Sequence, residues 1–192
     1  MLFNYLCKHT KRKLTEFPKL LMHVDGGCQP KNPGGVATAA WVLYDGNDPK
    51  TLLVEEGRVV ADGGPNATNN YGEYASLVFA LLYLWEQDWR GNLLVKADSK
   101  LLVEQISGRW KVKDEKLKGL RDRVVKLIDD TELHRVTPED PIPPEGKGTF
   151  EIVHVMREFN TYADEVSNRA YQKYNNQKKE SKDGAAPTTP KD

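Results

Sequence analysis

Residues 20–35 read L-L-M-H-V-D-G-G-C-Q-P-K-N-P-G-G, and the rest of the chain is organised around them. The first half predicts an apolar strand with Leu20, Met22 and Val24 on one face, because side chains alternate along a strand. Asp25 closes this strand, where an unpaired carboxylate is costly to bury. The residues after it predict a sharp turn: Gly26, Gly27, Pro30, Pro33, Gly34 and Gly35. Asp25 therefore either hydrogen-bonds to the turn or joins other acidic side chains in a site.

Composition places few limits on function. The chain has 192 residues, which suits one domain with tails, and its formal net charge of zero indicates no class of partner. No apolar stretch is long enough to cross a membrane. The two cysteines, Cys7 and Cys28, form no zinc motif and no disulfide framework. We therefore expect a cytoplasmic monomer with no membrane partner.

Charge and proline divide the chain into segments. Residues 1–19 are expected to form a basic arm, because their apolar part is too short for a secretory signal. Residues 20–174 are the predicted domain, within which 129–149 is an acidic, proline-rich loop. Residues 175–192 contain nothing that could form a core, so a disordered tail is predicted. Lys96–Lys126 is the basic segment, with ten Lys and Arg against five Asp and Glu.

Apolar periodicity predicts an α/β fold with a five-stranded mixed sheet flanked by helices. Two strands, 37–44 and 52–60, continue the first strand as an antiparallel meander. A helix from about Tyr71 to Glu86 follows, with Asn69 or Asn70 as its N-cap. The remaining predicted elements are a strand at 93–97, helices at 100–107 and 114–128, a strand at 150–156 and a helix at 161–174 capped by Asn160.

Four carboxylates lie at the ends of these elements: Asp25, Glu73, Asp98 and Asp164. Each alone has an ordinary structural interpretation, such as a turn aspartate or a first-turn glutamate. If strand 93–97 lies parallel to the first strand, however, Asp25 and Asp98 become neighbours at the carboxyl ends. Clustered carboxylates repel one another unless cations neutralise them, and all-oxygen ligands favour Mg²⁺ or Mn²⁺.

Four motifs occur in order: D-G-G-C…N-P-G-G, T-N-N-Y-G-E, A-D-S and H-V-M-R-E-F-N-T-Y-A-D. Together they resemble type 1 ribonuclease H over about residues 20–174, and most of all its archaeal and plant-like branch without the basic protrusion. The resemblance implies a ribonuclease H-like fold and an endonuclease that hydrolyses the RNA strand of RNA–DNA hybrids, leaving 5′-phosphate and 3′-hydroxyl ends. It also implies that Asp25, Glu73, Asp98 and Asp164 bind two Mg²⁺ ions, or Mn²⁺, with Asp25 shared between them.

The same resemblance implies contacts with the substrate. Asn32, Asn69 and Asn70 fall where the family contacts the minor groove of the hybrid, and an amide both donates to and accepts from a 2′-hydroxyl. Lys100 occupies a position where many bacterial members carry glutamine.

Two residues are candidates for an auxiliary catalytic role. His154 has the spacing of the catalytic histidine of bacterial members, yet it lies inside an apolar strand, where we expect it to be partly buried. Arg157 follows that strand and can hold a phosphate, so we favour it for the role. His23 we interpret as structural.

Two alternatives stay open at this point. Another nuclease of the same fold, such as a junction resolvase, is one, because a fold does not define a function. The T-N-N-x-x-E and N-P-G-G pieces argue against it. The other is a non-catalytic nucleic-acid-binding module, which the presence of all four carboxylates disfavours.

Overall fold

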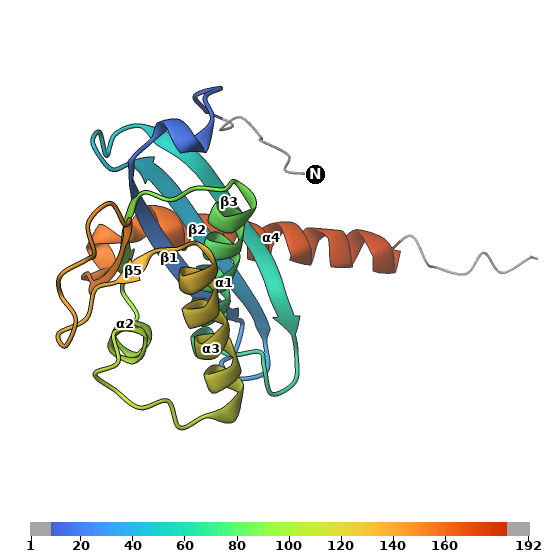
Figure 1. Ribbon diagram of the computed structural model, residues 1–192. Helices are drawn as coiled ribbons and strands as arrows, with labels where there is room; N and C mark the ends of the chain where they lie inside the picture. Colours follow the sequence, from blue (N-terminus) through green and yellow to red (C-terminus); the bar gives the residue numbers. More distant parts are fainter. Residues whose placement is uncertain (1–8, 184–192) are drawn as a thin grey trace, which may run out of the picture.

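The computed structural model describes residues 9–183 and shows one mixed sheet with helices on both faces (Figure 1). Along the chain the helices and strands are β1 (Lys19–Gln29), β2 (Val36–Asp45), β3 (Leu52–Asp62), α1 (Asn69–Glu86), β4 (Asn92–Ala97), α2 (Lys100–Ile106), α3 (Glu115–Asp130), β5 (His134–Arg135), β6 (Thr149–His154) and α4 (Thr161–Asp183). Two short 3₁₀ helices, η1 (Leu14–Glu16) and η2 (Arg157–Phe159), complete the described chain. None of these helices is long and apolar enough to span a membrane.

The sheet has the strand order β3-β2-β1-β4-β6-β5. β1, β2 and β3 are antiparallel neighbours, as the sequence predicted, and β4 is parallel to β1, which was the condition for bringing Asp25 next to Asp98. β6 is parallel to β4, a pairing that was not predicted from the sequence. The prediction of five strands is wrong by one. β5 comprises two residues inside the expected acidic loop, which is too short for an alternating pattern to reveal.

The core lies mainly between the sheet and α1, α2 and α3, while α4 covers β1–β3 from the opposite face (Figure 1). Leu20, Met22 and Val24 are fully buried in the main core, which confirms the predicted apolar face of the first strand. The alternate residues of β1 therefore face α4. This division of faces decides which side chains of β1 reach the site described below.

β1 does not turn at its glycines. It continues to Gln29, with Gly26 paired to Ala39 and Gly27 paired to Thr38, and the turn follows from Pro30. A Cβ on Gly26 would lie 2.0 Å from the backbone nitrogen of Glu73, so this glycine allows α1 to approach the strand. Close approach, rather than a turn conformation, explains the residue.

α1 begins two residues earlier than predicted. Thr68 is the N-cap and its hydroxyl accepts a hydrogen bond from the Tyr71 amide at 3.1 Å, so Asn69 and Asn70 are the first helical residues. A threonine side chain suits this position because its oxygen accepts from the free amides of the first turn. Both asparagine side chains are left exposed.

Both ends of the domain extend beyond the predicted boundaries. Leu14 and Phe17 are 2% exposed, and the Trp89 indole donates to the Phe17 carbonyl at 2.7 Å, so the last part of the expected basic arm belongs to the core. Its first eight residues, with Cys7, lie outside the described part. α4 continues to Asp183 instead of ending at Tyr174, because Gln177, Lys178, Lys179 and Glu180 are good helix formers and Lys178 pairs with Asp62 at 2.7 Å. The rest of the predicted disordered tail, 184–192, lies outside the described residues.

Candidate active site

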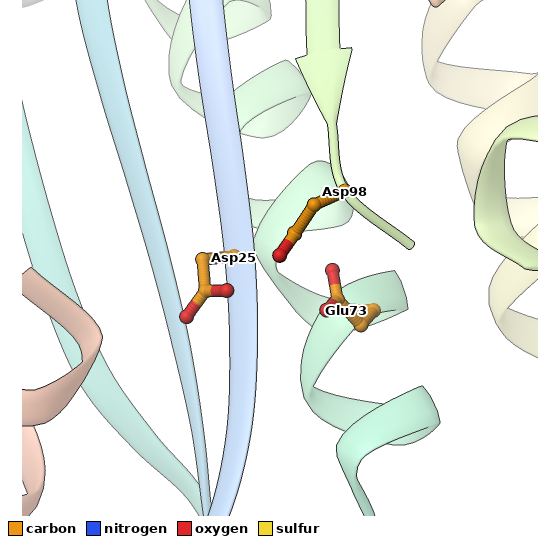
Figure 2. A group of neighbouring side chains, drawn as sticks. All are labelled: Asp25, Glu73 and Asp98. Carbon is orange, nitrogen blue, oxygen red and sulfur yellow. The ribbon is translucent and has the colours of Figure 1, made fainter. Parts of the chain in front are cut away.

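Three carboxylates from three elements meet where β4 ends. Asp25 lies on β1, Glu73 near the start of α1 and Asp98 directly after β4 (Figure 2). One oxygen of each lies within 4.8 Å of the other two. The parallel register pairs Val24 with Ala97. The residues that follow these two, Asp25 and Asp98, therefore lie side by side. The structure thus brings together three of the four acidic residues that the sequence singled out.

Burial and mutual repulsion alter the acidity of this cluster. Burial raises the pKa of Asp25 to about 7, and the charges of Asp98 and Asp164 act in the same direction. The pKa of Glu73 is held well above its ordinary value, first by burial and then by the charge of Asp25. The cluster therefore has excess negative charge that either a proton or a cation must neutralise.

Glu73 shows that the residues present fit a metal ion. Its Oε2 atom is buried and has no hydrogen-bond partner among the described residues. Such an orphaned oxygen is costly unless an ion satisfies it. All the candidate ligand atoms are carboxylate oxygens, which hard divalent cations such as Mg²⁺ and Mn²⁺ prefer.

Asp164, the fourth predicted carboxylate, lies in the first turn of α4 and lines the same cavity of about 490 Å³. Both of its oxygens are already bonded. Arg157 donates to Oδ1 at 2.7 Å, and Asn168 donates to Oδ2 at 2.9 Å. The predicted four-carboxylate cluster is therefore three grouped carboxylates with a paired fourth beside them.

The predicted substrate-binding residues lie around this cavity. Asn69 and Asn70 line its rim and are exposed. Asn32 and Asn70 line an adjoining cavity, and the Asn32 amide oxygen accepts from the Asn69 backbone at 3.2 Å. Lys100 is exposed at the start of α2, one residue after Ser99, which lines the first cavity.

The expected burial of His154 is wrong. His154 is the last residue of β6 and is exposed, because the packed part of the strand ends at Ile152. Its Nε2 atom lies 3.2 Å from the Asp98 carbonyl oxygen. Arg157 is also exposed, on η2, and its charge is partly balanced by Asp164.

Asn160 has a different role from the helix cap predicted for it. Its side chain is almost fully buried and donates to the Val24 carbonyl at 2.9 Å and to Asp98 Oδ1 at 3.1 Å. His23 Nδ1 lies 3.1 Å from the other end of the same amide, so His23 packs beside the site as a structural residue.

The lining residues that were not found from the sequence include two on α4, Ser167 and Asn168. Asn160 lies four residues before Asp164, Ser167 three residues after it and Asn168 four residues after it. That spacing places them on one helix face and was the available signal.

The sheet order and the carboxylate cluster define a ribonuclease H-like domain. A family model described as "Reverse transcriptase-like" matches residues 23–137, and the chain belongs to this family. Its relatives include type 1 ribonucleases H, which confirms the resemblance seen in the four motifs.

Two curated relatives are similar over most of this chain. One is ribonuclease HI of Halobacterium salinarum, 30% identical over 147 residues that make up 75% of this chain and 60% of that protein. The other is a bifunctional protein of Mycobacterium tuberculosis, 31% identical over 79% of this chain and 35% of that protein. This chain therefore spans between about a third and three fifths of these relatives.

Solved structures agree with the sequence relatives. The ribonuclease H1 of Halobacterium salinarum superposes with a TM-score of 0.62, at 25% identity, over 81% of this chain and 98% of that one. LC11-RNase H1, solved in complex with an RNA/DNA hybrid, superposes with a TM-score of 0.63, at 28% identity, over 81% of this chain and 98% of that one.

Proposed function

We propose that the protein is a divalent-metal-dependent endonuclease that hydrolyses the RNA strand of RNA–DNA hybrids, leaving 5′-phosphate and 3′-hydroxyl ends. The observation that carries this proposal is the group of three carboxylates with the orphaned Glu73 oxygen. A similar protein was solved with an RNA/DNA hybrid, which supports the same substrate class here.

The carboxylates would hold two Mg²⁺ ions, or Mn²⁺. Asp25, Glu73 and Asp98 supply grouped oxygens, and Asp164 adds a fourth carboxylate at the same cavity. Bound metal ions supply activation of the attacking water and neutralise charge on the leaving oxygen. The charges of Asp98 and Asp164 both act on Asp25, which suits a ligand shared between two ions.

The asparagines and the basic residues would bind the two strands differently. Asn32, Asn69 and Asn70 face the cavities at the start of α1, where their amides can recognise ribose 2′-hydroxyls and so distinguish RNA from DNA. Lys100 and the basic segment 96–126 would hold phosphates. We therefore expect hybrid binding to weaken with salt.

The decisive experiment is a cleavage assay on labelled RNA–DNA hybrid, duplex RNA, duplex DNA and junction DNA, each with Mg²⁺ and with EDTA. The proposal expects cleavage of the hybrid's RNA strand only, and only with the metal. Cleavage of junction DNA instead would identify a resolvase, and binding without cleavage would identify a non-catalytic module. Size-exclusion chromatography and localisation would test the monomeric state and cytoplasmic location that we also propose.

Arg157→Ala is expected to lower turnover by at least about tenfold, equivalent to about 1.4 kcal/mol of barrier. Its guanidinium is exposed at the cavity, and the exposed ion pair with Asp164 is too weak to keep it from a substrate phosphate. Single-turnover cleavage rates measure the effect on turnover, and thermal melts measure any effect on stability separately.

His154→Ala decides the assignment of the auxiliary role. Because His154 is exposed, we expect its removal to change stability little. Arg58→Ala is the matched control for Arg157→Ala, because it removes an arginine that is also paired with a carboxylate, Glu56, but on β3 and away from the cavity. Normal cleavage by Arg157→Ala together with a large loss in His154→Ala would show that the histidine holds the role.

A further inference from the structure

α4 and the residue just before it carry three hydrogen-bond donors, and each is bonded to a different carboxylate of the site. Asn160, just before the helix, donates to Asp98 Oδ1 at 3.1 Å. Asn168 donates to Asp164 Oδ2 at 2.9 Å. Ser167 is buried and its hydroxyl hydrogen-bonds to Asp25. These three donors thus bond to two carboxylates from β1 and the end of β4 and to one, Asp164, on α4 itself.

Each of these donors is itself held by a polar side chain from the sheet. His23 Nδ1 lies 3.1 Å from Asn160 Oδ1, and Gln29 Nε2 donates to Asn168 Oδ1 at 2.6 Å. Thr38 Oγ1 lies 2.9 Å from Ser167 Oγ, and both hydroxyls are almost fully buried. There are therefore three pairs of consecutive hydrogen bonds. In each pair, a strand side chain bonds to one of the three donors, and that donor bonds to a carboxylate.

The partners also fix which way each donor points. The oxygen end of the Asn160 amide receives the bond from His23, so its NH₂ end is directed at the Val24 carbonyl and at Asp98. The same holds for Asn168, whose oxygen end accepts from Gln29. For Ser167, a bond donated by Thr38 leaves its own hydrogen for Asp25.

The strand pattern explains why these partners are within reach. His23, Asp25, Gly27 and Gln29 alternate along β1 and share the face that α4 covers. A Cβ on Gly27 would lie 2.9 Å from Thr38 Oγ1 and 3.4 Å from Ser167 Oγ. The glycine therefore leaves the space in which the two hydroxyls meet.

We propose that Asn160, Ser167 and Asn168 are positioning residues that orient the carboxylates for metal binding, and that His23, Thr38 and Gln29 lock them in place. This rests on the proposed function only in taking the carboxylates as metal ligands. Partners behind metal ligands commonly change metal affinity by about 10–100-fold when they are removed. Glu73 lies on α1, outside this arrangement, and keeps its unpartnered oxygen.

Thr38 offers a matched pair of variants for the test. Thr38→Val keeps the shape and removes the hydroxyl, whereas Thr38→Ser removes a methyl group and keeps the hydroxyl. We expect Thr38→Val to weaken Mn²⁺ binding, measured by titration calorimetry, by roughly tenfold, and Thr38→Ser to bind as the wild type does. Gln29→Leu should weaken binding similarly. In cleavage assays both weakened variants should need more Mg²⁺ yet recover most of the maximal rate.

Tyr162→Phe is the control for a merely structural role. Tyr162 on α4 hydrogen-bonds to Glu55 on β3, so this variant also loses a bond between helix and sheet, but away from the carboxylates. It should leave Mn²⁺ affinity unchanged. Equal Mn²⁺ affinity in the wild type, Thr38→Val and Gln29→Leu would overturn the inference. A different result separates the two proposals. If Thr38→Val and Gln29→Leu bind Mn²⁺ more weakly but even the wild type does not cleave the hybrid, the proposed function is overturned and the positioning role stands.

Discussion

Asp25→Asn is expected to abolish RNA-strand cleavage while it stabilises the metal-free protein at neutral pH. The amide cannot supply the charge that metal ligation needs, and the substitution removes one of the three grouped carboxylates that repel one another. The variant should therefore melt several degrees higher than the wild type in EDTA, since about 1 kcal/mol corresponds to ~2–4 °C for a domain of this size.

The effect should depend on pH in a defined direction. Burial, with Asp98 and Asp164, raises the folded-state pKa of Asp25 from 3.8 to about 7, so the folded state holds this proton more tightly than the unfolded state does. The stabilisation that this tighter proton binding gives is complete at pH values below 3.8, the pKa of Asp25 in the unfolded state, and it is lost as pH rises to about 7. Asparagine does not titrate, so Asp25→Asn has no such loss. The melting temperatures of the wild type and of Asp25→Asn should therefore diverge as pH rises through this range.

Thermal melts in EDTA at several pH values, together with single-turnover cleavage in Mg²⁺, measure both parts. Asp98→Asn is expected to lose cleavage in the same way. Retained cleavage in either variant would be incompatible with the proposed site, and a melting difference that shrinks with rising pH would contradict the assigned cause.

Gly26→Ala is expected to cost about 3 kcal/mol of stability or more and to lower cleavage at least about a hundredfold. The new Cβ would lie 2.0 Å from the Glu73 backbone nitrogen and 2.3 Å from the Gly72 carbonyl carbon, and neither is the end of a flexible side chain. α1 must therefore move away from β1 and take Glu73 with it. Overpacking costs of this kind reach about 1–3 kcal/mol or more, and a displacement of about 1 Å at a reacting group can cost about 100-fold in rate.

Gly119→Ala is the matched control. Gly119 lies within α3, and nothing stands within 4 Å of where its Cβ would be. Alanine is favoured over glycine inside a helix by up to about 1 kcal/mol, so this variant should be slightly more stable and cleave normally. Chemical denaturation and cleavage rates of both variants decide the matter. If Gly26→Ala unfolds at the denaturant concentration of the wild type, the close packing of α1 on β1 has been misjudged.

The sequence predicted the order of the long elements from local patterns, and it placed Asp25 beside Asp98 on the condition that their two strands pair in parallel. Apolar alternation marks β1 and β2, and helical periodicity marks α1 and α3. The crossover connection predicted that β4 is parallel to a neighbouring strand, and the structure shows that this neighbour is β1.

The parts that were missed depend on contacts between distant residues. Gly26 and Gly27 have the sequence signal of a turn, and only the positions of α1 and α4 show that they serve close packing. Asn160 has the signal of a helix cap, yet its amide bonds to residues more than 60 positions away, Val24 and Asp98. The burial of His154 was overestimated because the strand pattern does not show where β6 loses its cover.

β3 has a consequence for how copies of the protein meet one another. It is a long strand at the edge of the sheet, and such an edge exposes backbone groups that can pair with a strand of another molecule. Here its pairing with β2 shifts register at two points, and it carries Glu55, Glu56 and Arg58 in its middle. Irregular pairing and charge both oppose edge-to-edge association. The β3 edge is thereby protected from pairing with a strand of a neighbouring molecule, and this favours resistance to aggregation.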